Sequence, residues 1–387
     1  MTIVNLPGSS GFLFQSTEEA LNKRLRDNPE QFTDLQLWLN SDTNLKDLND
    51  AILHNRTIRE VCLLIHESFQ QHSAKDILRL FRALGALPQL KKLLFNTYRF
   101  PFVATLPIQA FTNAFQGSHN TLTEFKLWRC DLSLLSEEDG SPIREMERCA
   151  NALNGAKNLK VFRLVKCTLT EETRKLCTLD PILQALTHLP CLQEMELSAT
   201  EFSALGTISK STLRSLFRST SLLELNLRHF YLDEESILEI AYSLFQYHDI
   251  DNHHRKSQKE QEDHQHPAYC HRHKPSKIQS LSMSGITKNQ TSTGSVMISK
   301  PVREAFQKVL RSNYTLETLF LFDTWNLKSE IEFYTKLNRL GRNRLLQDHK
   351  ATRQEWIDLL VQIKDDLDCL FYFLSMNPLL CSSQEDE

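Results

Sequence analysis

The stretch NLKVFRLVKC, residues 158–167, holds the pattern that decides the fold. Leu159, Phe162 and Leu164 are apolar, with two variable residues after the first and one after the second. The same spacing recurs in nine sets, which open at Phe32, Ile58, Leu90, Leu122, Leu159, Leu192, Leu222, Ile278 and Leu316. Because internal repeats of 20 to 50 residues are typical of stacked units, this recurrence indicates a repeat array rather than one closed core.

A second apolar register supports the first. Six residues before the opening position, an apolar residue ends a stretch of helical spacing, at Ile52, Leu84, Leu153, Leu186, Leu216 and Leu310. Each unit is therefore predicted to contain a short strand, a turn, a helix and a return loop. Since helices are wider than strands, the stack should curve with its parallel strands on the concave side.

These LxxLxLxxN/C signatures resemble the ribonuclease-inhibitor-like leucine-rich repeats over residues 32–345. The resemblance implies an α/β leucine-rich-repeat solenoid of about nine units, a curved horseshoe with a concave parallel sheet and convex helices. Two segments, 332–346 and 365–378, also resemble the ending of uncharacterised microalgal leucine-rich-repeat proteins. The chain departs from the repeat pattern where the Asn position holds Tyr98, Phe230 or Ile286.

Both ends of such a stack need a cover, because an open end exposes leucines to water. We expect residues 1–31 to form an N-terminal segment and cap, with a helix at 18–26. Residues 346–380 should form a C-terminal helical cap, with residues 381–387 as a disordered tail. Thr352 and Glu355 form a capping-box sequence there. Eight apolar side chains after them are predicted to share one helical face: Trp356, Leu359, Leu360, Ile363, Leu367, Leu370, Phe371 and Leu374.

A charged, histidine-rich insertion at 249–276 explains the long interval between two of the sets. It has too few aliphatic residues to order itself, so we expect a disordered loop. Its candidate metal ligands are His264, His266, Cys270, His271 and His273. Their spacing matches no structural zinc motif, so we assign no metal site and keep weak metal binding as an alternative.

The remaining sequence favours a non-enzymatic intracellular protein. No phosphate-binding loop, nucleophile elbow or HExxH motif occurs, and no cofactor is expected. A formal charge of −3 gives no preference for nucleic acid or membrane. The nine scattered cysteines and the lack of a signal peptide favour the cytoplasm, with the nucleus left open. We therefore interpret the glycosylation sequons at Asn55, Asn289 and Asn313 as chance matches.

The variable strand positions predict a protein-binding surface on the concave sheet. The fifth and seventh positions of the repeat should point outward as two ladders. We expect a partner protein to contact Lys126, Trp128, Arg129, Arg163, Lys166, Glu196 and Arg228. The predicted function is a protein–protein interaction scaffold. Because Ran GTPase-activating proteins and F-box substrate adaptors have similar repeats, a regulator or adaptor of another enzyme is the alternative.

Overall fold

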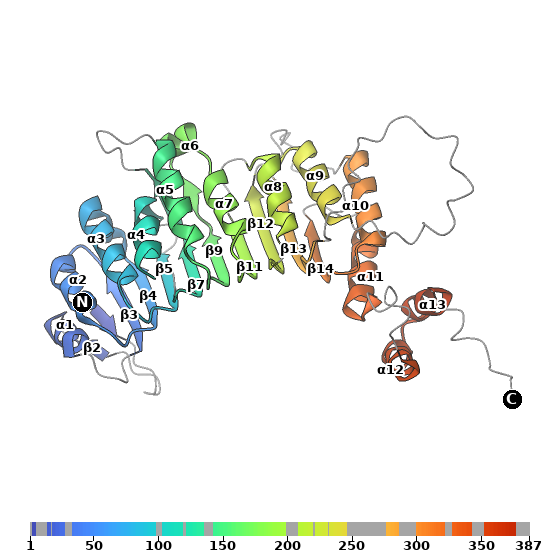
Figure 1. Cartoon of the computed structure of the whole chain (residues 1–387), viewed down its shortest axis with the longest axis horizontal. Helices are drawn as coiled ribbons and strands as arrows, with labels where there is room; N and C mark the ends of the chain where they lie inside the picture. The colour runs from blue at the N-terminus through green and yellow to red at the C-terminus, as the bar shows by residue number, and fades with distance from the viewer. Residues whose placement is uncertain are drawn as a thin grey trace.

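Nine parallel strands form an open sheet in the computed structural model (Figure 1). They are β3 (Asp34–Leu39), β4 (Glu60–Ile65), β5 (Lys92–Thr97), β7 (Glu124–Trp128), β9 (Val161–Val165), β11 (Glu194–Ser198), β12 (Glu224–Phe230), β13 (Ser280–Gly285) and β14 (Thr318–Leu321). Their order in the sheet follows their order in the chain. The predicted α/β fold with a parallel sheet is therefore confirmed.

The structure describes most of the chain in separate ranges. These are residues 2–4, 14–16, 18–27, 33–97, 103–118, 121–134, 142–198, 208–219, 221–230, 232–245, 276–285, 299–321, 327–342 and 352–376. The predicted tail at 381–387 and the five candidate metal ligands lie outside them, as does nearly all of the insertion at 249–276. No helix within these ranges is long and apolar enough to cross a membrane.

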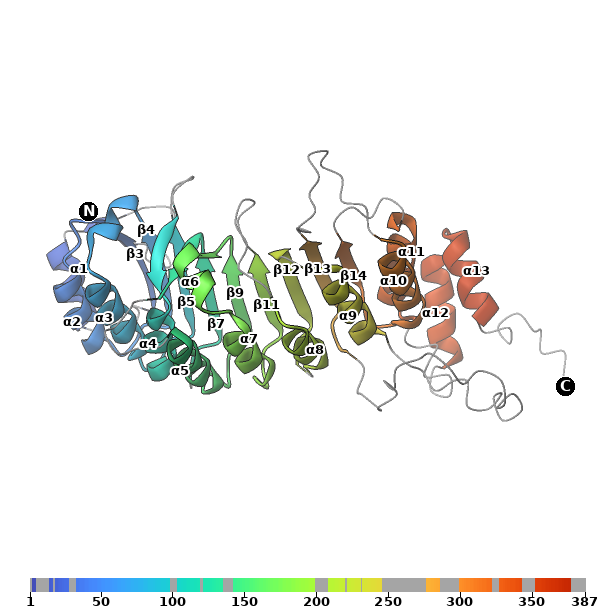
Figure 2. The ribbon, with the colours of Figure 1, turned by 90° about the horizontal axis from the view of Figure 1, so that it is seen from above.

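Helices cover one face of the sheet, as Figure 2 shows. They are α1 (Glu18–Asp27), α2 (Leu45–His54), α3 (Ala74–Gly85), α4 (Gln109–Ser118), α5 (Pro142–Asn154), α7 (Asp180–Thr187), α8 (Lys210–Arg218), α9 (Glu234–Leu244), α10 (Lys300–Ser312) and α11 (Lys328–Arg339). Helix α6 (Glu171–Leu176) contacts α5 instead. The six predicted helix-end residues are all buried. Apolar side chains of strands and helices meet in one continuous core from Leu21 to Ile331.

In-register pairing stacks equivalent core positions. Phe162 of β9 lies between Phe125 of β7 and Met195 of β11 in the sheet. The rings of Phe125 and Phe162 stack with their centroids 5.7 Å apart. Because the strands pair in register, apolar residues at the same repeat position form one layer of aligned side chains between the sheet and the helices.

A second, smaller parallel sheet was not predicted. It contains β6 (Ala104–Pro107), β8 (Cys130–Ser133) and β10 (Thr168–Leu169), in the order β10-β8-β6. The chain enters β8 through Arg129, at φ 57°, and enters β10 just after Lys166, at φ 53°. These two left-handed residues redirect the chain away from the main sheet at equivalent points of neighbouring units.

Two of the three sequons form buried turns. The Oδ1 of Asn55 accepts hydrogen bonds from the amides of Thr57 and Ile58, both at 2.9 Å. Its Nδ2 donates to the Leu25 carbonyl at 3.1 Å, in the preceding helix. The Oδ1 of Asn313 likewise accepts hydrogen bonds from the two amides at positions 315 and 316, and its Nδ2 donates to the Leu244 carbonyl. Both side chains therefore hold a helix end against the next turn, whereas Asn289 lies outside the described residues.

The N-terminal elements adjoin the first strand and helix of the main body. Strands β1 (Thr2–Val4) and β2 (Phe14–Ser16) pair antiparallel, and β1 contacts β3. Helix α1 packs on α2, so that Leu21 and Leu25 join the main core.

The C-terminal region forms two helices, α12 (Arg353–Ile363) and α13 (Leu367–Met376). The predicted capping box between Thr352 and Glu355 is confirmed. Their core is a second apolar cluster that includes Leu337 of α11. The prediction of one shared apolar face is wrong, because Leu367 and Phe371 are 76% and 75% exposed. The reason is the break between Ile363 and Leu367, which starts a new helix with a different facing.

Candidate protein-binding face

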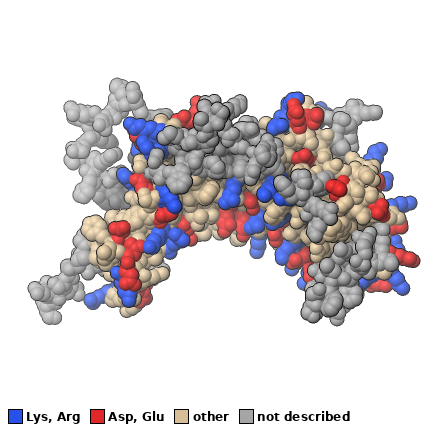
Figure 3. Space-filling model, turned by 180° about the vertical axis from the view of Figure 1, so that it is seen from behind, with Lys and Arg blue, Asp and Glu red and all other residues tan. Residues whose placement is uncertain are grey.

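The strand side opposite the helices, here called the sheet face, carries three aligned rows of side chains. The acidic row contains Asp34, Glu60, Lys92, Glu124, Val161, Glu194, Glu224, Ser280 and Thr318. The middle row contains Gln36, Cys62, Leu94, Lys126, Arg163, Glu196, Asn226, Ser282 and Phe320. The outer row contains Trp38, Leu64, Asn96, Trp128, Val165, Ser198 and Arg228. Figure 3 views the molecule from this side, with basic and acidic atoms gathered near its middle.

Sequence reasoning found the middle and outer rows but missed the acidic row. The missed signal is the same alternation, since each acidic-row residue precedes its middle-row residue by two positions. Five of its members are carboxylates and one is a lysine. The fifth and seventh repeat positions alone therefore do not include the acidic row, which has the strongest charge pattern on the sheet face.

Two outer-row positions are buried instead of facing solvent. Val165 is 9% exposed and Ser198 is 5% exposed. The Oγ of Ser198 accepts a hydrogen bond from the amide of Lys166 at 3.1 Å. Ser198 thus supports the left-handed bend at Lys166, and the outward ladder is interrupted there.

The structure divides the seven predicted contact residues into two groups. Lys126, Arg163 and Glu196 lie in the middle row, and Trp128 and Arg228 lie in the outer row. Arg129 and Lys166 instead occupy the two left-handed bends at the edge of the sheet. The Arg129 amide donates to the Val165 carbonyl at 2.9 Å, which holds one bend in place.

Lys126 and Trp128 interact with each other. The Nζ of Lys126 lies 4.8 Å from the centroid of the Trp128 ring, within the range of a cation–π contact. One face of this half-buried indole is therefore already occupied by a side chain of the same strand.

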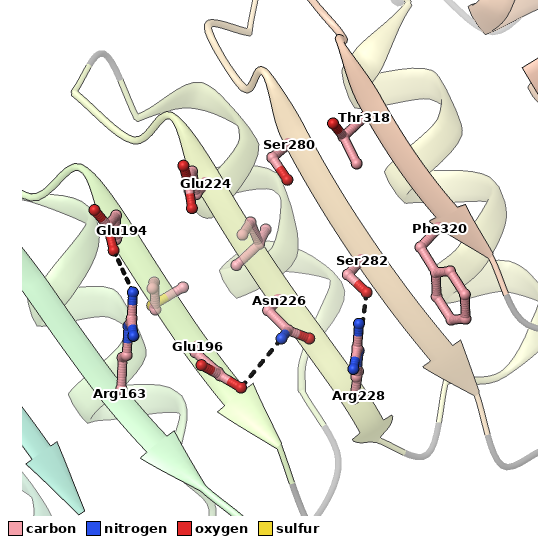
Figure 4. Close-up of a pocket in the computed structure, with 12 residues that line it drawn as sticks. Arg163, Glu194, Glu196, Glu224, Asn226, Arg228, Ser280, Ser282, Thr318 and Phe320 are labelled. Atoms are coloured by element: carbon pink, nitrogen blue, oxygen red, sulfur yellow. Dashed lines mark hydrogen bonds and ion pairs between the residues drawn. The ribbon is translucent and has the colours of Figure 1, made fainter. Parts of the chain in front are cut away.

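A groove of about 320 Å³ crosses strands β9 to β14 (Figure 4). Its lining comprises Arg163, Glu194, Met195, Glu196, Glu224, Leu225, Asn226, Arg228, Ser280, Ser282, Thr318 and Phe320. Three predicted contact residues, Arg163, Glu196 and Arg228, therefore line one groove. Its other lining residues on the sheet face belong to the acidic and middle rows of β11, β12, β13 and β14.

Pairs of neighbouring strands fix the polar groups of the groove. Arg163 Nη2 lies 2.5 Å from Glu194 Oε2, and Asn226 Nδ2 donates to Glu196 Oε1 at 3.2 Å. Burial lowers the pKa of Arg163, but the hydrogen bond and charge of Glu194 outweigh this and raise that pKa above its ordinary value. The guanidinium therefore stays charged and held in position.

An aromatic side chain closes the other end of the groove. Arg228 Nε donates to Ser282 Oγ at 3.1 Å, and its guanidinium carbon lies 5.2 Å from the Phe320 ring centroid. Phe320 is 49% exposed. Exposed aromatic and arginine side chains are the groups that most often anchor protein interfaces.

Metal ligands and reactive thiols are other groups that could carry chemistry. Within those ranges, no three His, Cys, Asp or Glu side chains are placed to hold a metal ion. The described cysteines are all free. Burial raises the pKa of Cys149 to about 12 and that of Cys130 well above its ordinary value, so both thiols stay protonated.

No family model and no curated protein matches this chain. Among solved structures, it is similar to the tropomodulin C-terminal domain of Caenorhabditis elegans, with 13% identity over 44% of this chain and 91% of that one. The TM-score of that comparison is 0.27, too low to support an argument about fold or function.

Proposed function

We propose that the chain is a ribonuclease-inhibitor-like leucine-rich-repeat solenoid of about nine units, and that it binds a partner protein on the sheet face. One observation carries the proposal: charged and aromatic side chains stand in register across strands that no helix of the described residues covers on that side. A preformed sheet presents these groups with a smaller ordering cost on binding than a flexible segment, which favours affinity.

The dimensions of the sheet face suit a protein partner. Nine strands at a spacing of about 4.8 Å extend for roughly 38 Å, and the acidic and outer rows lie about 13 Å apart. That footprint is roughly 500 Å². A partner that also reaches the edges of the sheet would bury close to the roughly 800 Å² per side of a standard interface.

The test compares two arginines that each form an ion pair. Arg163 lies on the sheet face and pairs with Glu194, whereas Arg214 lies on the helix side and pairs with Glu239. The double variant Trp128→Ala/Arg163→Ala should lose a protein that the wild type and Arg214→Ala capture from a native extract. Thermal denaturation of all three forms checks that folding is intact. Identical capture by the double variant and the wild type would refute the proposal.

A further inference from the structure

The two halves of the sheet face differ in character. Over β3 to β7, five of the eight positions in the middle and outer rows carry apolar groups, here called the apolar strip: Trp38, Cys62, Leu64, Leu94 and Trp128. The other three positions hold Gln36, Asn96 and Lys126. Over β9 to β13, the same rows carry charged, amide and hydroxyl side chains, apart from Val165. Every member of the apolar strip is half-buried and retains surface open to solvent. A contiguous apolar surface of this kind marks a site of association.

The acidic row runs beside the apolar strip. On these strands it contains Asp34, Glu60 and Glu124 with one base, Lys92, so three negative charges and one positive charge leave −2. The Nζ of Lys92 lies 2.7 Å from Glu60 Oε1. Within the described residues, neither Asp34 nor Glu124 forms an ion pair.

Lys92 compensates only part of the negative charge of the acidic row on these strands. Asp34 and Glu60 are direct neighbours in the parallel register, and like charges in that position repel. A cationic ligand would relieve the repulsion. The same half of the sheet face thus combines an apolar surface with charge complementarity to lysine and arginine.

The spacing of the rows indicates the shape of the ligand. The acidic and outer rows are four residues apart along each strand, or about 13 Å. A helix with its side chains is about 10 to 12 Å wide, so one helix lying across the strands contacts both rows. A single extended strand takes up only about 4.8 Å of width and would follow one row.

Building on the binding function proposed above, we infer that the β3–β7 half of the sheet face binds an amphipathic basic helix of a partner protein. The apolar stripe of that helix packs on the apolar strip, and its lysine and arginine flank faces the acidic row. Lys126, held over Trp128, places a positive charge on β7 and disfavours a basic flank that continues past this half.

The test uses a display library of helical 18-residue peptides. The full chain is the bait, and Leu64→Asp is the matched bait that places a charge in the apolar strip. Selected peptides should have leucine or phenylalanine at helical spacing and an excess of lysine and arginine on one flank. Binding to Leu64→Asp should be at least about tenfold weaker. The charge reversal Asp34→Lys/Glu60→Lys should instead select acidic flanks.

Three results would overturn the inference. They are selected peptides without a basic excess, equal binding to a correctly folded Leu64→Asp bait, or no selection at all. A dimer of the chain that Leu64→Asp dissociates, seen by analytical ultracentrifugation, would assign the surface to a second copy instead. If a native partner depends on Arg163 but not on Leu64, the binding function stands and only this inference fails.

Discussion

Arg342 and Tyr372 join the last two helices to the main body, because the Nε of Arg342 donates to the Tyr372 hydroxyl at 2.8 Å. Arg342 is 2% exposed, and its other nitrogens donate to the carbonyls of Leu310 and Arg311 in the last turn of α10. The buried guanidinium therefore lies at the negative end of the α10 dipole. Its carbon also lies 4.3 to 5.3 Å from the ring centroids of Tyr314, Tyr334 and Tyr372.

Replacing Arg342 should loosen this junction. Arg342→Leu leaves the Leu310 and Arg311 carbonyls without these donors, so we expect the free energy of unfolding to fall by about 3 kcal/mol. Tyr372→Phe removes one hydrogen bond and should cost about 1 kcal/mol. Urea denaturation measures both changes, and limited proteolysis should cut α12 and α13 of Arg342→Leu first. Equal losses in the two variants would contradict this account.

Acid should weaken the same region through Asp366. A hydrogen bond from Lys336, followed by one from the Cys369 amide, lowers the pKa of Asp366 from 3.8 to about 2. A lowered pKa in the folded state contributes stability above the unfolded pKa, and this contribution is lost as pH falls from 3.8 towards about 2. Asp366→Asn cannot titrate. Asp366→Asn should therefore melt below the wild type at neutral pH, and the difference between the two melting temperatures should shrink as the pH falls towards about 2. A difference that stays constant with pH would count against this role of Asp366.

Close packing of two helices leaves no room for a side chain at Gly85. A Cβ added there would lie 2.5 Å from the Asn113 carbonyl oxygen and 2.8 Å from that of Ala114, both in α4. Helix propensity alone predicts that alanine stabilises by about 1 kcal/mol. We expect Gly85→Ala to destabilise instead, by about 2 kcal/mol, because backbone atoms must move. Chemical denaturation gives the sign, and a gain in stability would show that the helices separate easily.

The buried turn at Asn55 should be worth several hydrogen bonds. Asn55→Ala removes an acceptor of two amides and a donor to Leu25, so a loss of about 3 kcal/mol is expected. The exposed Asn154→Ala is the matched control and should change stability by less than about 0.5 kcal/mol. Calorimetric unfolding measures the difference. A similar effect of both substitutions would argue that the turn forms without its side chain.

Removing Arg163 should leave the fold intact. Arg163 and Glu194 are each about one third exposed, and ion pairs of this kind contribute less than about 1 kcal/mol. Arg163→Ala should therefore melt close to the wild type, as measured by differential scanning calorimetry. A large drop would mean that Arg163 is structural, and the capture experiment would then need another residue of the groove.

The apolar spacing in sequence predicted the layers of the fold and one side of the candidate site. Leu159, Phe162 and Leu164 are buried as expected, because alternation along a strand fixes which side chains face the helices. The same alternation places Lys126, Arg163 and Glu196 on the opposite side. It also places the acidic row on that side, two positions before the middle row on each strand.

Other features depend on residues that the chain brings together from separate units. Sequence alone did not pair Arg163 with Glu194, 31 residues later, or Arg342 with Tyr372, because such contacts require the register between strands and the packing of helices. The bends at Arg129 and Lys166 had no signal either, since neither residue type favours positive φ. Local periodicity therefore determined which side of the sheet each residue faces. Only the tertiary structure determined its neighbours, because contact partners are set by stacking between units rather than by spacing within one.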